Sequence, residues 1–121
     1  MQQYDTNNIF YKIINKEVKA NIVLEGEHFI AFHDIAPKAP VHILVIPKGM
    51  YIDYNDFALN ANDVEILEFN RGISEVVKIM RLEKYGFKII SNAGKFTTPD
   101  FPEPQSVMHM HVHILGKSAE E

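Results

Sequence analysis

The sequence has no cysteine and no long apolar run, and each absence narrows the class of protein. Without cysteine the chain forms no disulfide and offers no thiolate to a metal, which agrees with a reducing cytoplasm. Its longest apolar stretches, such as VHILVIP over residues 41–47, are much shorter than the roughly 20 residues that span a bilayer. The opening MQQYDTNNIF lacks the basic start and apolar segment of a secretory signal. We therefore expect a cytoplasmic protein without a membrane partner.

An excess of positive charge is missing as well. The 121 residues carry a formal net charge of −4 at pH 7, whereas proteins that coat DNA or RNA need a basic surface for the phosphates. We therefore expect no nucleic-acid partner, although small anionic ligands, which need only local hydrogen-bond donors, stay possible. The hydrophobic content of 46% is ordinary for a globular protein, and the length predicts a single domain over residues 1–121.

Apolar periodicity divides the chain into two helices and five strands. Residues 6–17 place apolar side chains at helical spacing after Asn7 or Asn8, either of which is suited to cap a helix. A long helix is predicted over residues 62–84, with its end at Gly86. Strands are expected at residues 21–25, 28–34, 41–47, 87–91 and 108–116. Because tight turns join several strands, the order predicts an α+β fold with an antiparallel sheet and the helices on one side of it.

Three of the six histidines stand at alternate positions in the stretch MHMHVHILG. Alternate side chains of a strand share one face, so His109, His111 and His113 are expected together, at or near the surface of the sheet. The apolar residues between them point to the other face, where they are expected to pack against the long helix.

Three interpretations of this histidine stretch are open. In a metal site each ring would bring a nitrogen to about 2.0–2.1 Å from one zinc ion, but the outer Cα atoms lie about 13 Å apart in an extended strand, which would have to bend. Alternatively, the rings only cover an exposed face of the sheet. In the third interpretation one neutral imidazole, with an ordinary pKa of about 6.5, is a nucleophile toward phosphorus. Its neighbours would then donate hydrogen bonds to the phosphoryl oxygens.

The residues from His109 to Leu115 match the pattern His-φ-His-φ-His-φ-φ, in which φ is hydrophobic, and the stretch resembles the motif of the histidine-triad (HIT) family. Two more segments support the resemblance: FHDIAPKAPVHILVIPK upstream, and SNAG followed by QSV. Together they cover the chain from about residue 8 to Gly116. The branch that the sequence resembles most is that of the Hint-type nucleoside phosphoramidases.

This resemblance implies both a fold and a reaction. The implied fold is a five-stranded antiparallel sheet with one long and one short helix, and the sheet continues across a homodimer. The implied activity is that of a metal-independent nucleotide hydrolase, similar to an adenosine 5′-monophosphoramidase, that needs no cofactor. Its small-molecule substrates would be purine nucleoside 5′-phosphoramidates or related nucleotidyl compounds. His111 would attack the α-phosphorus and form a covalent nucleotidyl-histidine, from which water releases the nucleoside monophosphate, such as AMP.

The resemblance also assigns roles to single residues. His113 would stabilise the phosphate, His109 would organise the nucleophile, and His42 would support the nucleophile's tautomer and a proton relay. The residues implied in catalysis are His111, His113, His109, His42 and Ser106. Those implied in nucleotide binding are Phe32, Asp34, Ile35, Asn92, Gln105, Ser106, Val107, His111 and His113, with Gln105 and Val107 contributing backbone amides. No residue is expected to hold a metal.

The sequence departs from the Hint branch between Asn92 and Gln105. This loop is longer than usual, and Pro104 stands where glycine is common, which removes a backbone donor near the phosphate. The proline-rich part, residues 96–104, could form a lid or be an inert insertion. Three alternatives therefore stay beside the phosphoramidase: a dinucleoside polyphosphate hydrolase, a nucleotide-binding module without significant turnover, and a histidine-rich metal carrier. Ser106 weighs against the first, and the retained catalytic set weighs against the second.

Overall fold

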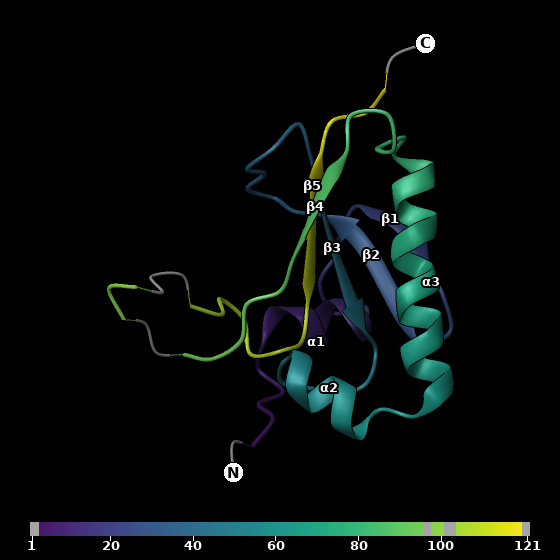
Figure 1. The fold of residues 1–121 in the computed structure, drawn as a ribbon. Helices are drawn as coiled ribbons and strands as arrows, with labels where there is room; N and C mark the ends of the chain where they lie inside the picture. Colours follow the sequence, from purple (N-terminus) through teal and green to yellow (C-terminus); the bar gives the residue numbers. More distant parts are fainter. Residues whose placement is uncertain (1–2, 96–97, 101–103, 120–121) are drawn as a thin grey trace.

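A computed structural model describes residues 3–95, 98–100 and 104–119 of the protein. The elements in chain order are α1 (Ile9–Ile14), β1 (Ile22–Glu25), β2 (Phe29–His33), β3 (Val41–Pro47), α2 (Tyr54–Asn60), α3 (Asp63–Ile79), β4 (Phe87–Ile90) and β5 (Val112–Gly116). The strands form one antiparallel sheet in the order β1-β2-β3-β5-β4 (Figure 1). The predicted α+β class with a five-stranded antiparallel sheet is confirmed. Part of the proline-rich loop, residues 96–97 and 101–103, lies outside the described ranges.

The sheet is covered on both faces, and the prediction of helices on one side only is wrong. On one face, Ile43 and Ile114 of the central strands pack with Val76 of α3. On the other face, α1 places Phe10 against Phe32 of β2, with ring centroids 5.7 Å apart. Because both faces are covered, every residue of the central strand β3 is buried, and its sequence VHILVIP is apolar at nearly every position. Figure 1 shows α1 and α3 on opposite sides of the strands.

The long helix α3 begins where the sequence predicts and ends earlier. Asn62 caps its start, and a reciprocal pair of hydrogen bonds with Glu65 completes a capping box. The helix ends at Ile79, because Arg81 adopts a left-handed φ of 58° that an α-helix does not continue through. Gly86, which was expected to end the helix, lies in the turn before β4 with a φ of 83°.

A third helix, α2, was missed by the sequence analysis. Its signals are local: the side chain of Asp53 accepts a hydrogen bond from the amide of Asp56, and Phe57 is the one residue of the helix that is buried. Phe57 packs on Phe69 of α3, with ring centroids 5.0 Å apart. A seven-residue helix with a single buried side chain has too short an apolar repeat to stand out from the sequence.

Strand β4 is an open edge of the sheet. All four of its residues are exposed, and three of them, Phe87, Ile89 and Ile90, are large hydrophobic side chains. Apolar side chains on a free strand edge favour pairing with another strand. Among the described residues, no helix has the length and apolar character needed to cross a membrane.

Candidate active site

The histidine stretch is less exposed than its sequence suggests. The regular strand β5 begins only at Val112, so His109 and His111 lie in the segment that leads into it. Alternation persists, because Met110 and Ile114 are in the core beneath α3. The expected surface position is nevertheless wrong for two of the rings: the exposed fraction is 0% for His109 and 2% for His111. The reason is α1, which covers this face of the sheet.

His111 is held in one tautomer by the backbone. Its Nδ1 lies 2.7 Å from the carbonyl oxygen of His109, and because a carbonyl only accepts, this nitrogen carries the proton. The other nitrogen, Nε2, therefore keeps its lone pair. Burial lowers the pKa of His111, which favours the neutral ring. The hydroxyl of Ser91 also donates to the carbonyl of His111 at 2.8 Å and fixes the backbone at this point. His111 thus has the protonation pattern of a nucleophile.

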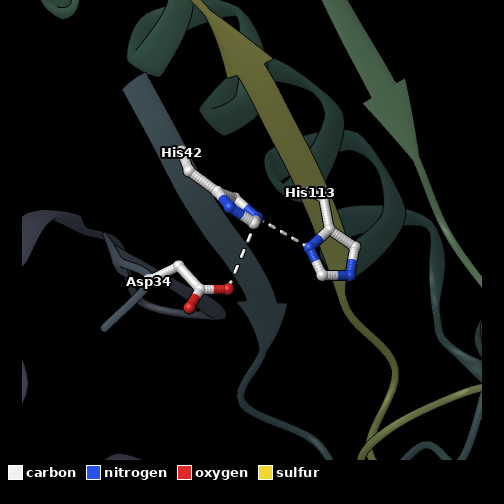
Figure 2. A group of neighbouring side chains, drawn as sticks. All are labelled: Asp34, His42 and His113. Atoms are coloured by element: carbon white, nitrogen blue, oxygen red, sulfur yellow. Dashed lines mark hydrogen bonds and ion pairs between the residues drawn. The ribbon is translucent and has the colours of Figure 1, made fainter. Parts of the chain in front are cut away.

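His113 is fixed in the opposite tautomer by a chain of two hydrogen bonds. The backbone amide of Lys38 donates to Nδ1 of His42 at 3.1 Å, so His42 carries its proton on Nε2. That nitrogen lies 2.9 Å from Nδ1 of His113, which accepts the proton (Figure 2). The Nε2 of His113 is then left as an N–H donor. Burial, together with the nearby His111 and His42, lowers the pKa of His113 to about 4 and keeps the ring neutral.

These contacts place His42 differently from the role that the family resemblance implies. His42 contacts His113 and not His111, and the tautomer of His111 is set by the carbonyl of His109. Asp34 approaches the same nitrogen of His42, with a carboxylate oxygen 3.4 Å from its Nε2 (Figure 2). The other carboxylate oxygen accepts a hydrogen bond from the amide of Ala36 at 2.8 Å, which closes the turn after β2.

His109 is wholly enclosed and lines neither of the cavities described below. Its Nε2 donates to the carbonyl of Pro47 at 2.7 Å, and its Nδ1 is hydrogen-bonded to the hydroxyl of Tyr4. Burial lowers the pKa of His109 to about 4, so this ring is neutral as well. In the structure its ring packs behind the segment that leads to His111.

Two cavities meet at Asp34, Ser106 and His113. The smaller, of about 300 Å³, is mainly apolar and contains His111. Its other lining residues are Ile9, Phe10, Ile13, Val18, Lys19, Ala20, Phe32, His33, Ile35, Leu44 and Val107. The larger, of about 530 Å³, is lined in addition by Ala36, Lys38, His42, Ile90, Asn92, Pro104 and Leu115. His111 and His113 therefore lie where an apolar pocket opens into a more polar one.

The predicted nucleotide-binding residues fall into two groups. Phe32, Asp34, Ile35, Asn92, Ser106, Val107, His111 and His113 line one or both cavities. Gln105 lines neither cavity. Its backbone amide donates to the carbonyl of Gly94 at 2.9 Å, and its side-chain amide donates to the carbonyl of Ile52 at 2.6 Å. Because that amide is engaged, Gln105 braces the loop in this structure and offers no free donor to a phosphate.

Several residues that shape the site were missed from the sequence. Lys38 and Pro47 act through backbone groups, which carry no side-chain signal in a sequence. Tyr4 and Ser91 act through hydroxyls, but Tyr4 is far from any motif. The stretch SNAG, used above for the family resemblance, was the one hint for Ser91.

Potential metal ligands also converge at this site. The nitrogens of His42 and His113 and an oxygen of Asp34 all lie within 4.8 Å of one another. The three histidines of the motif form no such group in the described part of the chain. The ring nitrogens of His109 and the Nδ1 of His111 are moreover engaged in other hydrogen bonds. A second group, Glu27, His28 and Glu68, lies away from the cavities and is more exposed.

Comparison with known proteins identifies the family. The HIT domain profile matches residues 15–120. A 13.2 kDa HIT-like protein of Azospirillum brasilense is 42% identical over 113 residues, which cover 93% of this chain and 88% of that protein. A histidine triad protein from Clostridium difficile has a similar structure, with a TM-score of 0.76 and 32% identity over 100% of this chain and 97% of that one. A HIT family hydrolase from Clostridium thermocellum has a TM-score of 0.73 and 29% identity, over 95% and 94% of the two chains.

The chain therefore belongs to the HIT domain family, and its fold is that of a HIT family hydrolase.

Proposed function

We propose that the protein hydrolyses purine nucleoside 5′-phosphoramidates through a covalent intermediate on His111. The observation that carries the proposal is the pair of fixed tautomers: an unprotonated Nε2 on His111 beside an Nε2–H donor on His113, with ring centroids 5.0 Å apart. Both rings are neutral near pH 7, since burial lowers their pKa values. Attack on phosphorus requires an unprotonated nucleophile and a hydrogen-bond donor to the phosphoryl oxygens, and the two rings supply these groups.

The reaction follows in two balanced steps. Nε2 of His111 forms a bond to the α-phosphorus while the bond from phosphorus to the leaving nitrogen breaks, and the amine takes up a proton from solvent as it departs. The His111 ring gains positive charge in this step, and the carbonyl of His109, 2.7 Å from Nδ1, stabilises that charge. The N–H of His113 donates to the phosphoryl oxygens. Water then attacks phosphorus and gives up a proton to solvent, the bond to Nε2 breaks so that His111 is neutral again, and the nucleoside monophosphate leaves.

The two cavities fit the two halves of such a substrate. The smaller one is lined by aromatic and aliphatic side chains, among them Phe32 and Ile13, and suits a purine base. Asp34 stands at the junction of the cavities, where its carboxylate would accept from ribose hydroxyls. The leaving group would extend into the larger cavity past Asn92 and Ser106.

The test is hydrolysis of adenosine 5′-phosphoramidate in excess EDTA by the intact protein, by His111→Ala and by His28→Asn. His28 is a histidine outside both cavities and is the matched control. We expect AMP from the intact protein and the control, no AMP from His111→Ala, and a nucleotidyl adduct on the acid-quenched intact protein by mass spectrometry. Activity in His111→Ala would refute the assignment of the nucleophile.

The same assay separates the alternatives. Turnover of a dinucleoside polyphosphate with none of the phosphoramidate would favour the polyphosphate hydrolase. Binding of AMP by calorimetry without any turnover would favour a binding module. A cytoplasmic location, a single domain and the absence of nucleic-acid and membrane partners remain predictions.

A homodimer is part of the proposal, and the exposed edge β4 supports it. Two copies paired along β4 would continue the sheet and cover Phe87 and Ile89, which are 41% and 53% exposed in one chain. The apolar side chains of α3 that the core leaves exposed, such as Ile79, could add to the contact. Sedimentation at micromolar concentration distinguishes a dimer from a monomer.

Cation binding is a second candidate property, favoured by the convergence of Asp34, His42 and His113. In a tetrahedral zinc site, neighbouring ligand atoms are about 3.3 Å apart, close to the 2.9 and 3.4 Å observed around Nε2 of His42. Zinc at Nε2 of His42 would require the proton of that ring on Nδ1, so the hydrogen bond from the amide of Lys38 would have to break. The bond between the two rings would be lost as well, and His113 would lose its role. We expect Zn²⁺ to inhibit hydrolysis in competition with AMP, and EDTA to reverse it. If micromolar Zn²⁺ neither binds by calorimetry nor inhibits, this candidate fails.

A further inference from the structure

Tyr4 stands in an N-terminal segment without any motif, yet its hydroxyl reaches a histidine of the triad. The phenol oxygen is hydrogen-bonded to Nδ1 of His109, and the side-chain amide of Asn8 donates to the same oxygen at 3.0 Å. The Tyr4 ring also meets the His109 ring edge-on, with centroids 5.6 Å apart. These contacts lie behind the reactive face, since neither Tyr4 nor His109 lines the two catalytic cavities.

We propose that Tyr4 is a positioning residue, which holds His111 in its reactive tautomer and orientation by fixing His109; this inference rests on the proposed function. Tyr4 touches neither the substrate cavities nor His111. Its effect is transmitted entirely through one buried ring and the backbone attached to it.

The directions of the hydrogen bonds make Tyr4 necessary for His109. A neutral imidazole has one donor and one acceptor nitrogen. The donor of His109 is used by the carbonyl of Pro47 at 2.7 Å, so Nδ1 must accept. The ring has no exposed surface, so bulk solvent does not reach this nitrogen, and a buried donor has to satisfy it. The hydroxyl of Tyr4 is the donor that satisfies it, and the amide of Asn8, which donates to Tyr4, turns the hydroxyl proton toward His109.

His109 and His111 are coupled because the acceptor for the nucleophile is the backbone of His109 itself. Nδ1 of His111 lies 2.7 Å from the carbonyl oxygen of His109, two residues earlier in the chain. If the ring of His109 shifts, this carbonyl shifts with it, and the hydrogen bond that fixes the tautomer of His111 loosens. In water the Nε2–H form of imidazole is accessible, and in that form the attacking nitrogen has no lone pair.

Asn8 anchors this arrangement to the fold. Its side-chain oxygen caps α1 by accepting from the amide of Tyr11 at 2.8 Å, while its side-chain nitrogen serves Tyr4. The same helix places Phe10 edge-on to His111, with ring centroids 5.0 Å apart. The start of α1 therefore sets the position of the Tyr4 hydroxyl relative to the triad.

The decisive variant is Tyr4→Phe, which removes one hydroxyl and keeps the ring. The matched control is Tyr11→Phe, a neighbouring tyrosine whose ring lies 6.0 Å from that of Tyr4. We expect Tyr4→Phe to lower kcat by about tenfold or more with little change in KM, because misplacement of a reactive group costs rate and not substrate binding. Tyr11→Phe should keep the kcat of the intact protein.

Nitrogen-15 NMR of the histidine rings, recorded without substrate, reports the tautomer of His111. This tautomer should not change if Tyr4 contributes only to the stability of the fold. The intact protein should show His111 as a single tautomer, protonated at Nδ1, and Tyr4→Phe should show a mixture of both tautomers. A second variant, Asn8→Asp, keeps a good helix cap but presents an acceptor to the Tyr4 hydroxyl in place of a donor. It should draw the hydroxyl proton away from His109 and reproduce the loss of kcat.

Failure of this inference and failure of the proposed function are distinguishable. If the intact protein releases no AMP, the function fails, and the NMR comparison alone decides on Tyr4. Wild-type kcat in Tyr4→Phe, an equal loss in Tyr11→Phe, or an unchanged single tautomer of His111 in Tyr4→Phe would each overturn the inference.

Discussion

His109 makes the free energy of unfolding depend on pH by an amount that can be calculated. Burial lowers its pKa from 6.5 to about 4. Below pH 6.5 the unfolded chain therefore binds a proton that the folded protein does not bind until about pH 4, so acid favours unfolding. A full proton of difference changes the free energy of unfolding by about 1.4 kcal/mol per pH unit. His109 alone should thus lower it by about 2 kcal/mol between about pH 6 and 4.5, and by about 3 kcal/mol across the whole window.

The assay compares urea unfolding of the intact protein and His109→Gln over this pH range. Glutamine keeps an amide donor for the carbonyl of Pro47, 2.7 Å from the imidazole it replaces, but it does not titrate. We expect the stability difference between the two proteins to shift by about 2 kcal/mol, with the intact protein losing more on acidification. Carboxylates that titrate in the same range affect both proteins and cancel. His113 contributes in the same direction in both, less strongly because water reaches it. Parallel stability curves would refute the reasoning.

Three further predictions concern activity and assembly. His42→Phe removes the donor that fixes His113, so kcat should fall about tenfold or more in steady-state assays; an unchanged kcat contradicts the relay. Ile13→Phe fills part of the cavity of about 300 Å³, so KM should rise about tenfold with kcat retained; an unchanged KM places the base elsewhere. Ile89→Lys on the edge β4 should yield monomers by sedimentation, whereas Leu59→Lys, even more exposed but on α2, should not; a dimer in both rejects the interface.

The fold was predictable where an element has a strong local pattern. The sequence VHILVIP and the cap at Asn62 located β3 and the start of α3, because a buried strand and a capping box depend on residues close in sequence. The covering of both sheet faces was not predictable in this way. It depends on α1 folding back over β2 and β3, a tertiary contact that the six residues of α1 do not reveal.

The candidate site was predictable to a lesser extent. Spacing and family resemblance named the histidines, and the structure brings His42 and His113 into contact although 71 positions separate them. The sequence could not show what each ring contacts, since three of the partners are backbone groups of Lys38, Pro47 and His109. Every residue type carries such groups, and only the folded chain determines which of them point at an imidazole.

The partner that the fold places beside each ring also explains how three identical side chains acquire different proposed roles. Because the histidines alternate along the chain, the carbonyl of His109 lies beside Nδ1 of His111, and the ring centroids of His111 and His113 are 5.0 Å apart. The partners then divide the work: an acceptor at Nδ1 of His111 frees its Nε2 for attack, while a donor at Nδ1 of His113 makes its Nε2 a donor. Full burial keeps His109 out of the proposed reaction, in which its carbonyl fixes His111. The alternating pattern therefore suits the proposed catalysis only because Tyr4 and Pro47 hold the ring of His109, and because Lys38 orients His42 against His113.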